Sequence, residues 1–282
     1  MMKKSVLWKI LSIATIVFLI IFVTLPLYWT FTIAFRPSRD LFMKRIIPSD
    51  ITLKNFASLI FSKNWGGFES VSFLVPLKNS LIVSGATTFI SVLISIFAGY
   101  GLARINIKRK ELFSGFVLFS YVFPPFILII ALYSFLHWIK LHNTLPGVVL
   151  LHLIIVVPYC TWTLRGYFMD LPKEIEEAAM IDGLTRIKTL FKIVLPSAAP
   201  GVVSATIFSF TLSWSELLFS MIVLDSYEKF TLPVAMRTMV IGDYVDWGKL
   251  MAGVVISLLP PVILYLGLQR FVVRGLTAGA IK

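Results

Sequence analysis

Glu216 is the acidic residue that lies deepest in a long apolar stretch of this sequence. Counted from Val202 at about 1.5 Å per helical residue, it lies about 21 Å along that stretch. Ionisable side chains are costly in hydrocarbon, so one at this depth indicates a functional site. The adjacent Trp214 and Ser215 offer an indole for stacking and a hydroxyl for hydrogen bonding, which makes all three candidates for a substrate path. The alternative is that Glu216 only caps the outer mouth or binds a partner helix.

The other reactive side chains predict no catalytic or metal centre. Cys160 is the only cysteine, so no disulfide can form within the chain, and its apolar surroundings indicate a buried, inert thiol. The three histidines, His137, His142 and His152, lack the spacing of metal ligands and are interpreted as packed or interfacial side chains. Because no nucleophile, base and metal gather at one depth, a membrane enzyme is disfavoured.

The sequence also lacks a loop suited to bind the phosphates of ATP. The nearest candidate runs from Gly242 to Lys249, but it has one residue too many between its two glycines. Leu250 stands where the motif needs Ser or Thr to hold Mg²⁺. We therefore expect the chain to bind no cofactor and to depend on a separate subunit for any ATP hydrolysis.

These residues belong to a chain that is too apolar for a soluble domain. Of its 282 residues, 58% are hydrophobic, against about 45–50% in soluble proteins, and the mean hydropathy is +0.90. A helix needs about 20 apolar residues to cross a hydrocarbon layer about 30 Å thick. Six runs meet this length and predict an all-α membrane protein with one transmembrane domain over residues 1–282: 10–35, 79–103, 113–138, 146–164, 199–224 and 251–269.

Basic residues predict which ends of these helices face the cytoplasm. The net charge is +12, and in a membrane protein an excess of Lys and Arg marks cytoplasmic loops rather than a nucleic-acid site. Basic clusters precede the first span and follow the second and fourth, which places both termini in the cytoplasm. The basic loop 36–76 argues the other way, but it is long and its charges are dispersed.

Two further patterns predict how the spans pack. The second span has a strip of small residues that lets another helix approach closely, namely Ser91, Ser95, Gly99 and Ala103. Pro124-Pro125 and Pro260-Pro261 fall inside the third and sixth spans, where each proline removes a backbone donor. Kinked or broken helices are expected there, either as structural features or beside a water-filled path. The first pair is therefore added to the candidate path residues.

The polar segment 170–197 begins with the pattern of a short helix. Asp170 can cap this helix, acidic residues follow in its first turn, and Gly183 supplies a left-handed stop. Ile175, Ala178 and Ala179 have the spacing of one apolar face, with the acidic residues on the other. We therefore expect the small-residue face to fit against another protein.

A second short helix in the same segment can begin at Thr185 and end before Pro196. The two helices together form an elbow, which is too short to be a domain but is shaped to dock in a cleft of a partner protein. The alternative is an amphipathic elbow that lies on the lipid surface. Its polar face is acidic rather than basic, which disfavours that alternative.

The elbow resembles the signature loop of the permease subunits of binding-protein-dependent bacterial ABC importers. The resemblance rests on Glu177-Ala178-Ala179, then Gly183, then nine residues to Ile193-Val194-Leu195-Pro196. Other motifs are similar to the carbohydrate-uptake branch typified by the maltose permease: Phe35-Arg36-Pro37-Ser38, Asn79-Ser80, Ile181-Asp182-Gly183 and the segment from Gly275 to Lys282. Leu184 and Ser215 depart from the residues common in that branch.

This resemblance implies a type I ABC importer permease fold with a coupling helix seated in a groove of a cytoplasmic ATPase subunit. The residues implied in that contact are Glu177, Ala178, Ala179, Asp182 and Gly183. The implied partners are a second permease, expected to be a different chain, two ATPase subunits that use ATP and Mg²⁺, and an extracellular solute-binding protein. The implied function is import of a sugar or oligosaccharide across the cytoplasmic (inner) membrane of a prokaryote.

The competing functional class is a secondary transporter driven by an ion gradient. Such transporters need buried carboxylates or unwound ion sites and often show duplicated halves. This sequence has a single deep acidic residue and no obvious internal repeat. The ion-driven alternative is therefore disfavoured.

Overall fold

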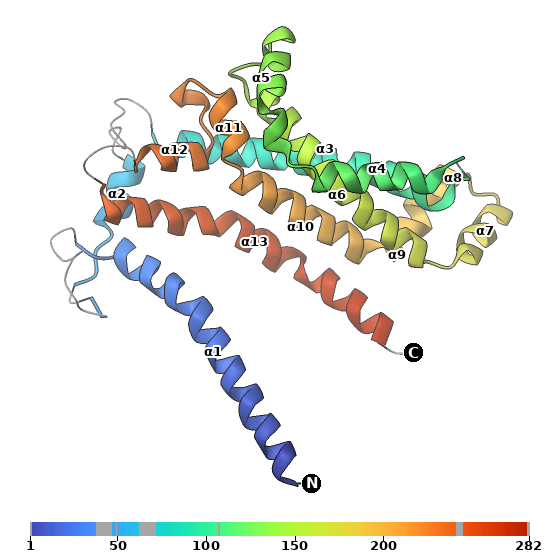
Figure 1. The fold of residues 1–282 in the computed structure, drawn as a ribbon, viewed down its shortest axis with the longest axis horizontal. Helices are drawn as coiled ribbons and strands as arrows, with labels where there is room; N and C mark the ends of the chain where they lie inside the picture. The colour runs from blue at the N-terminus through green and yellow to red at the C-terminus, as the bar shows by residue number, and fades with distance from the viewer. Residues whose placement is uncertain are drawn as a thin grey trace. The chain divides into compact units, whose positions relative to one another are not determined.

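A computed structural model describes residues 2–37, 47–48, 50–61, 72–106, 108–240 and 245–280. All secondary structure in these residues is helical, as predicted (Figure 1). The chain divides into two compact units, one of Met1–Phe73 with Met236–Leu258 and the other of Leu74–Ala235 with Leu259–Lys282.

In the first unit, the end of a long apolar helix is hydrogen-bonded to a short helix. Its helices are α1 (Met2–Ala34), α2 (Lys54–Phe61) and the first part of α13 (Trp247–Ala280). The side-chain amide of Asn55 donates to the carbonyl oxygens of Ala34 and Arg36, each at 2.8 Å. It thereby satisfies carbonyls that the end of α1 leaves without helical partners. Arg36, in the predicted Phe35–Ser38 motif, is buried, whereas Ser38 lies outside the described residues.

The second unit is a helix bundle in which small residues allow close approach. Its main helices are α3 (Leu74–Arg104), α4 (Lys110–Val122), α6 (Leu145–Asp170) and α10 (Ala199–Ser215). The predicted strip on α3 is buried: a Cβ on Gly99 would lie 3.0 Å from the backbone nitrogen of Arg165 on α6. Ser91 also reaches α10, with its hydroxyl oxygen 2.8 Å from that of Ser209. The prediction of close packing along this strip is confirmed.

One apolar core cluster of the second unit lies between α3, α6 and α10. Cys160 is fully buried in it, as predicted, with its thiol 3.6 Å from the carbonyl oxygen of Ala205. Other buried members come from α3, α6 and the segment before α10: Ile96, Tyr100, Val156, Leu164, Phe168, Leu190 and Val194. Helices α3, α6 and α10 therefore pack on one another, and α3 contacts both of the others.

The elbow segment is helical at the predicted place, but its limits differ. Its elements are α7 (Lys173–Ile181), α8 (Arg186–Thr189), the π-helix η3 (Leu190–Val194) and α9 (Leu195–Ser197). Asp170 does not cap α7, because it is the last residue of α6 and Pro172 occupies the N-cap position of α7. The second helical run also continues past Pro196, because that proline occupies a first-turn position of α9, where no backbone donor is needed.

Pro124 breaks the predicted third span. The residues from 113 to 138 form α4, a 3-10 turn η2 (Pro125–Leu128) and α5 (Ile129–Trp138) instead of one helix. Phe123 before the proline is extended, with φ −64° and ψ 128°, as the clash with a following proline ring favours. The second proline pair behaves differently, since helix α13 continues through Pro260 and Pro261.

The predicted fifth span is interrupted as well. Helix α10 ends at Ser215, Glu216 is extended, and a separate short helix α11 (Leu218–Val223) follows. The chain then forms the 3-10 turn η4 (Tyr227–Lys229) and α12 (Leu232–Thr238). The prediction of one helix over 199–224 is therefore wrong at Glu216.

Four described helices are long and apolar enough to cross a bilayer, and they coincide with four predicted spans: Trp8–Ala34, Leu74–Arg104, Leu145–Asp170 and Trp247–Phe271. The bent pair Arg186–Ser197 and Ala199–Ser215, with an angle of 81°, makes a fifth if it is one span. Within the second unit, α7 and α8 lie at one end of the bundle and α11 at the other (Figure 1). The elbow and the break at Glu216 before α11 therefore lie at opposite ends of the bundle.

Candidate functional site

Helix α7 has a buried face and an exposed face. They do not coincide with the apolar and acidic faces that the sequence predicts. Glu176 and Ala179 face inward, with 6% and 8% of their surface exposed. Ala178 is exposed, and so are the apolar side chains of Ile175 and Ile181. The prediction that all acidic residues occupy the solvated face is wrong for Glu176, because its carboxylate has partners on α3.

Glu176 fastens α7 to the end of α3. Its two carboxylate oxygens accept hydrogen bonds from the Tyr100 hydroxyl at 2.9 Å and from Arg104 Nε at 2.5 Å. Arg104 also donates through Nη2 to the carbonyl oxygen of Leu171 at 2.7 Å. Sequence reasoning missed this contact, although an arginine ending one predicted span and an acidic helix following another on the same side were visible signals.

Gly183 ends α7 as predicted. Its φ of +88° lies in the left-handed region, which a residue with a Cβ adopts only at a cost. Two backbone hydrogen bonds close the turn, from Gly183 to Met180 at 3.1 Å and from Leu184 to Ala179 at 3.1 Å. Glu177 and Asp182 are exposed beside it. The outward surface of the elbow thus consists of exposed polar and apolar side chains on a fixed turn.

Glu216 lies at the other end of the bundle and has several partners. Its carboxylate accepts the backbone N–H groups of Phe219 at 2.8 Å and Ser220 at 3.1 Å. Its Oε2 atom also lies 3.0 Å from Nε2 of His152, whose Nδ1 atom lies 2.7 Å from the hydroxyl oxygen of Ser213. Glu216 therefore caps α11 and ties the break to α6. His152 was predicted to be packed, and it is buried, but its pairing with Glu216 was missed.

The other candidate path residues are placed differently from one another. Trp214 is only 6% exposed and stacks on Phe210 with ring centroids 5.7 Å apart, so its ring face is already occupied. Ser215 is exposed, with its hydroxyl donating to the Thr211 carbonyl at 2.9 Å. Pro124 is exposed at the end of α4, and the side chain of Pro125 lies outside the described residues. No contact between Pro124 and the Glu216 break is among the described interactions.

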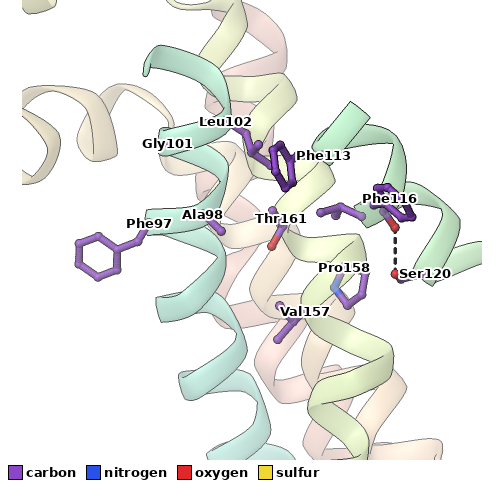
Figure 2. Close-up of a pocket in the computed structure, with 11 residues that line it drawn as sticks. Phe97, Ala98, Gly101, Leu102, Phe113, Phe116, Ser120, Val157, Pro158 and Thr161 are labelled. Atoms are coloured by element: carbon purple, nitrogen blue, oxygen red, sulfur yellow. Dashed lines mark hydrogen bonds between the residues drawn. The ribbon is translucent and has the colours of Figure 1, made fainter. Parts of the chain in front are cut away.

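An apolar groove opens on the second unit between α3, α4 and α6. Its volume is about 590 Å³, and Figure 2 shows the lining side chains, among which only Ser120 and Thr161 carry hydroxyls. The Ser120 hydroxyl donates a hydrogen bond to the Phe116 carbonyl oxygen at 2.9 Å, which Figure 2 draws as a dashed line. Such a lining suits hydrocarbon rather than a polar solute. The groove contains none of the predicted path residues.

Among the described residues, no group of three or more His, Cys, Asp or Glu side chains is placed to hold a metal ion. His137 and His142 stack on each other with ring centroids 4.0 Å apart, and the second pairs with Asp225 at 3.5 Å. The polar clusters at both ends of the bundle hold helices together. The arrangement is that of a multi-helix membrane protein.

Comparisons with known proteins agree with that class. Residues 91–278 match the family described as binding-protein-dependent transport system inner membrane component, and this chain belongs to that family. It is 34% identical to the diacetylchitobiose uptake system permease protein DasC of Streptomyces coelicolor, with 100% of both chains covered. It is 33% identical to the trehalose/maltose transport system permease protein MalG of Thermococcus litoralis, covering 100% of this chain and 99% of the other.

A solved structure shares the fold over nearly the whole length. A chain of a bacterial ABC transporter that imports the acidic polysaccharide alginate superposes with a TM-score of 0.77. The superposition covers 93% of this chain and 96% of that chain, at 20% sequence identity. This chain is therefore a transport subunit with an ABC importer permease fold, and its family is one of permeases rather than of ATPases.

Proposed function

We propose that this chain forms, with a second permease, the path by which an ATP-driven importer takes up a sugar or oligosaccharide. The observation that carries the proposal is alignment over the full length to permeases named for diacetylchitobiose and for trehalose and maltose. A solved importer in complex with a pentasaccharide-bound periplasmic protein has the same fold, with a TM-score of 0.69. By analogy with these relatives, the proposed importer also contains two ATPase subunits, and a solute-binding protein delivers the sugar to it.

The elbow is the proposed contact with the ATPase. Exposed apolar side chains on a short polar helix favour a protein partner, and Ile175 and Ile181 are 49% and 86% exposed. Glu177, Ala178 and Asp182 contribute to this contact from the outward face, and Gly183 sets the turn. Ala179 faces the rest of the elbow instead, and its small side chain lets α7 pack closely against α8 and η3.

The proposed topology has six spans in one permease domain, with both termini in the cytoplasm of a prokaryotic cell. The third span consists of α4 and α5 with the Pro124 break between them. The fifth consists of α10 and α11 with the Glu216 break between them. Unwound segments within spans are stable only beside protein or water, which suits a chain that lines a path.

The candidate path residues have two proposed roles. Ser215 and the Pro124-Pro125 break contact the solute, since Ser215 and Pro124 are exposed in the described chain. Trp214 and Glu216 hold the shape of the path. The carboxylate of Glu216 already has backbone and histidine partners, so releasing it to a sugar hydroxyl would leave polar groups unpaired.

Reconstitution tests the function directly. The chain is purified with its cognate subunits, placed in liposomes with ATP, and supplied with a binding protein and radiolabelled diacetylchitobiose, trehalose or maltose. We expect uptake that requires ATP and the binding protein and that survives collapse of ion gradients by ionophores. Uptake abolished by ionophores but independent of ATP would favour the secondary-transporter alternative.

A further inference from the structure

Arg104 joins three helices at the elbow end of the second unit. It is the last residue of α3, it donates to the Leu171 carbonyl just after α6, and it pairs with Glu176 in α7. A guanidinium presents several donors in a fixed planar fork, so one side chain can make both contacts at once. The positions of these three helix ends are thereby linked.

The contact is enclosed on all sides. The charged side chains of Arg104 and Glu176 are only 6% and 7% exposed. Tyr100 takes the second carboxylate oxygen, and its ring packs edge-on against Phe168 of α6 with centroids 5.9 Å apart. A buried charge that loses its partner is strongly disfavoured, because water does not replace the lost interaction. A movement of α7 is therefore disfavoured unless α3 follows it.

We propose that Glu176, Arg104 and Tyr100 form a positioning cluster that transmits movement of α7 to α3 and thus to the transport path. The proposal rests on the proposed docking of α7 on an ATPase subunit. Glu176 faces inward, away from the exposed surface of α7, so it acts through α3 rather than by contacting the ATPase. The cluster converts a displacement of a short peripheral helix into a displacement of a bundle helix.

The test compares transport with ATP hydrolysis in the reconstituted complex. Glu176→Gln keeps the shape and removes the charge, and Tyr100→Phe removes one hydrogen bond while keeping the ring. We expect the ATPase subunit to copurify in normal amounts with both variants. Solute imported per ATP hydrolysed should fall by about 2- to 30-fold in Glu176→Gln, the range of measured coupling changes, and less in Tyr100→Phe. Arg104→Lys, which retains the charge but not the fork, should be intermediate.

Glu174→Gln is the matched control, because it makes the same change on the exposed surface of the same helix. This variant should import as much solute per ATP hydrolysed as the unaltered complex does. A wild-type ratio in both Glu176→Gln and Tyr100→Phe, in a complex that transports normally, would overturn this inference alone. A parallel fall of copurification, hydrolysis and import would assign the cluster a merely structural role and overturn it too. Failure of the unaltered complex to couple ATP to uptake would instead refute the proposed function.

Discussion

His152 on α6 and Glu216 at the break between α10 and α11 lie with Nε2 and Oε2 3.0 Å apart, and the histidine is almost fully buried. The same carboxylate caps the first turn of α11. The pair therefore lies where one predicted span is interrupted, and it connects that interruption to a neighbouring helix.

His152→Ala should destabilise this end of the bundle. The substitution leaves Glu216 and Ser213 short of a buried partner, at an expected cost of about 1–3 kcal/mol. Cys160 is a natural reporter, since it is fully buried and reacts with a fluorogenic maleimide only when the bundle opens. The melting temperature measured this way in detergent should fall. Ser134→Ala, which removes an exposed hydroxyl bonded within its own helix, should leave it unchanged. Equal melting temperatures of the His152→Ala and Ser134→Ala variants would contradict the prediction.

Gly99→Ala should separate α3 from α6. An added Cβ would lie 3.0 Å from the Arg165 backbone nitrogen and 3.2 Å from the Thr161 carbonyl oxygen, neither of which can rotate away. Overpacking of this kind costs about 1–3 kcal/mol. Gly85→Ala on the same helix meets nothing within 4 Å and is the control. The melting temperature from Cys160 reactivity should fall for Gly99→Ala. An unchanged melting temperature would mean that α3 and α6 are less closely packed than the structure shows.

Gly183→Ala should weaken the elbow without any steric clash. Nothing lies within 4 Å of the new Cβ, but a φ of +88° strains any residue that carries one, by about 1–2 kcal/mol. Gly166→Ala, whose Cβ is equally free within α6, should be neutral or slightly stabilising. Sugar uptake at equal membrane expression is the measurement. Undiminished uptake by the Gly183 variant would show that the turn tolerates this strain.

Two adjacent alanines should respond differently to a tryptophan. Ala178→Trp alters the exposed face, so we expect loss of ATPase copurification with normal stability of the isolated permease. Ala179→Trp inserts a large side chain where only 8% of the alanine is exposed, so it should disrupt the elbow itself and raise its sensitivity to protease. Lys173→Ala, at the exposed start of α7, should change neither property. Copurification of the ATPase with Ala178→Trp would remove that residue from the proposed interface.

Cysteine labelling should establish the orientation. On a Cys160→Ala background, a cysteine at Lys108 is expected to face the cytoplasm and one at Asp225 the outside. Both side chains are exposed in the described structure, so burial does not confuse the result. A membrane-impermeant maleimide added to intact cells should modify only the second position. Modification of position 108 alone would mean that the orientation is reversed.

The sequence by itself determined the helical class, the positions of four long apolar helices, the close packing along Ser91 to Ala103 and the left-handed stop at Gly183. These features depend on composition, on helical periodicity and on the conformational freedom of single residues, all of which are local. The signature around Glu177 to Pro196 was also sufficient to indicate the family, because a spaced motif of this length needs no tertiary information.

Only the tertiary structure decided which face of α7 is covered and where Glu216 finds its partners. A sequence places Glu176 on a helix face, but it cannot show that Tyr100 and Arg104, more than 70 residues away, end at the same place. Likewise, the sequence cannot show that Glu216, at the interruption of the fifth span, pairs with His152, 64 residues earlier in the chain. Burial of a charge is decided by long-range partners, because only they compensate for the lost hydration.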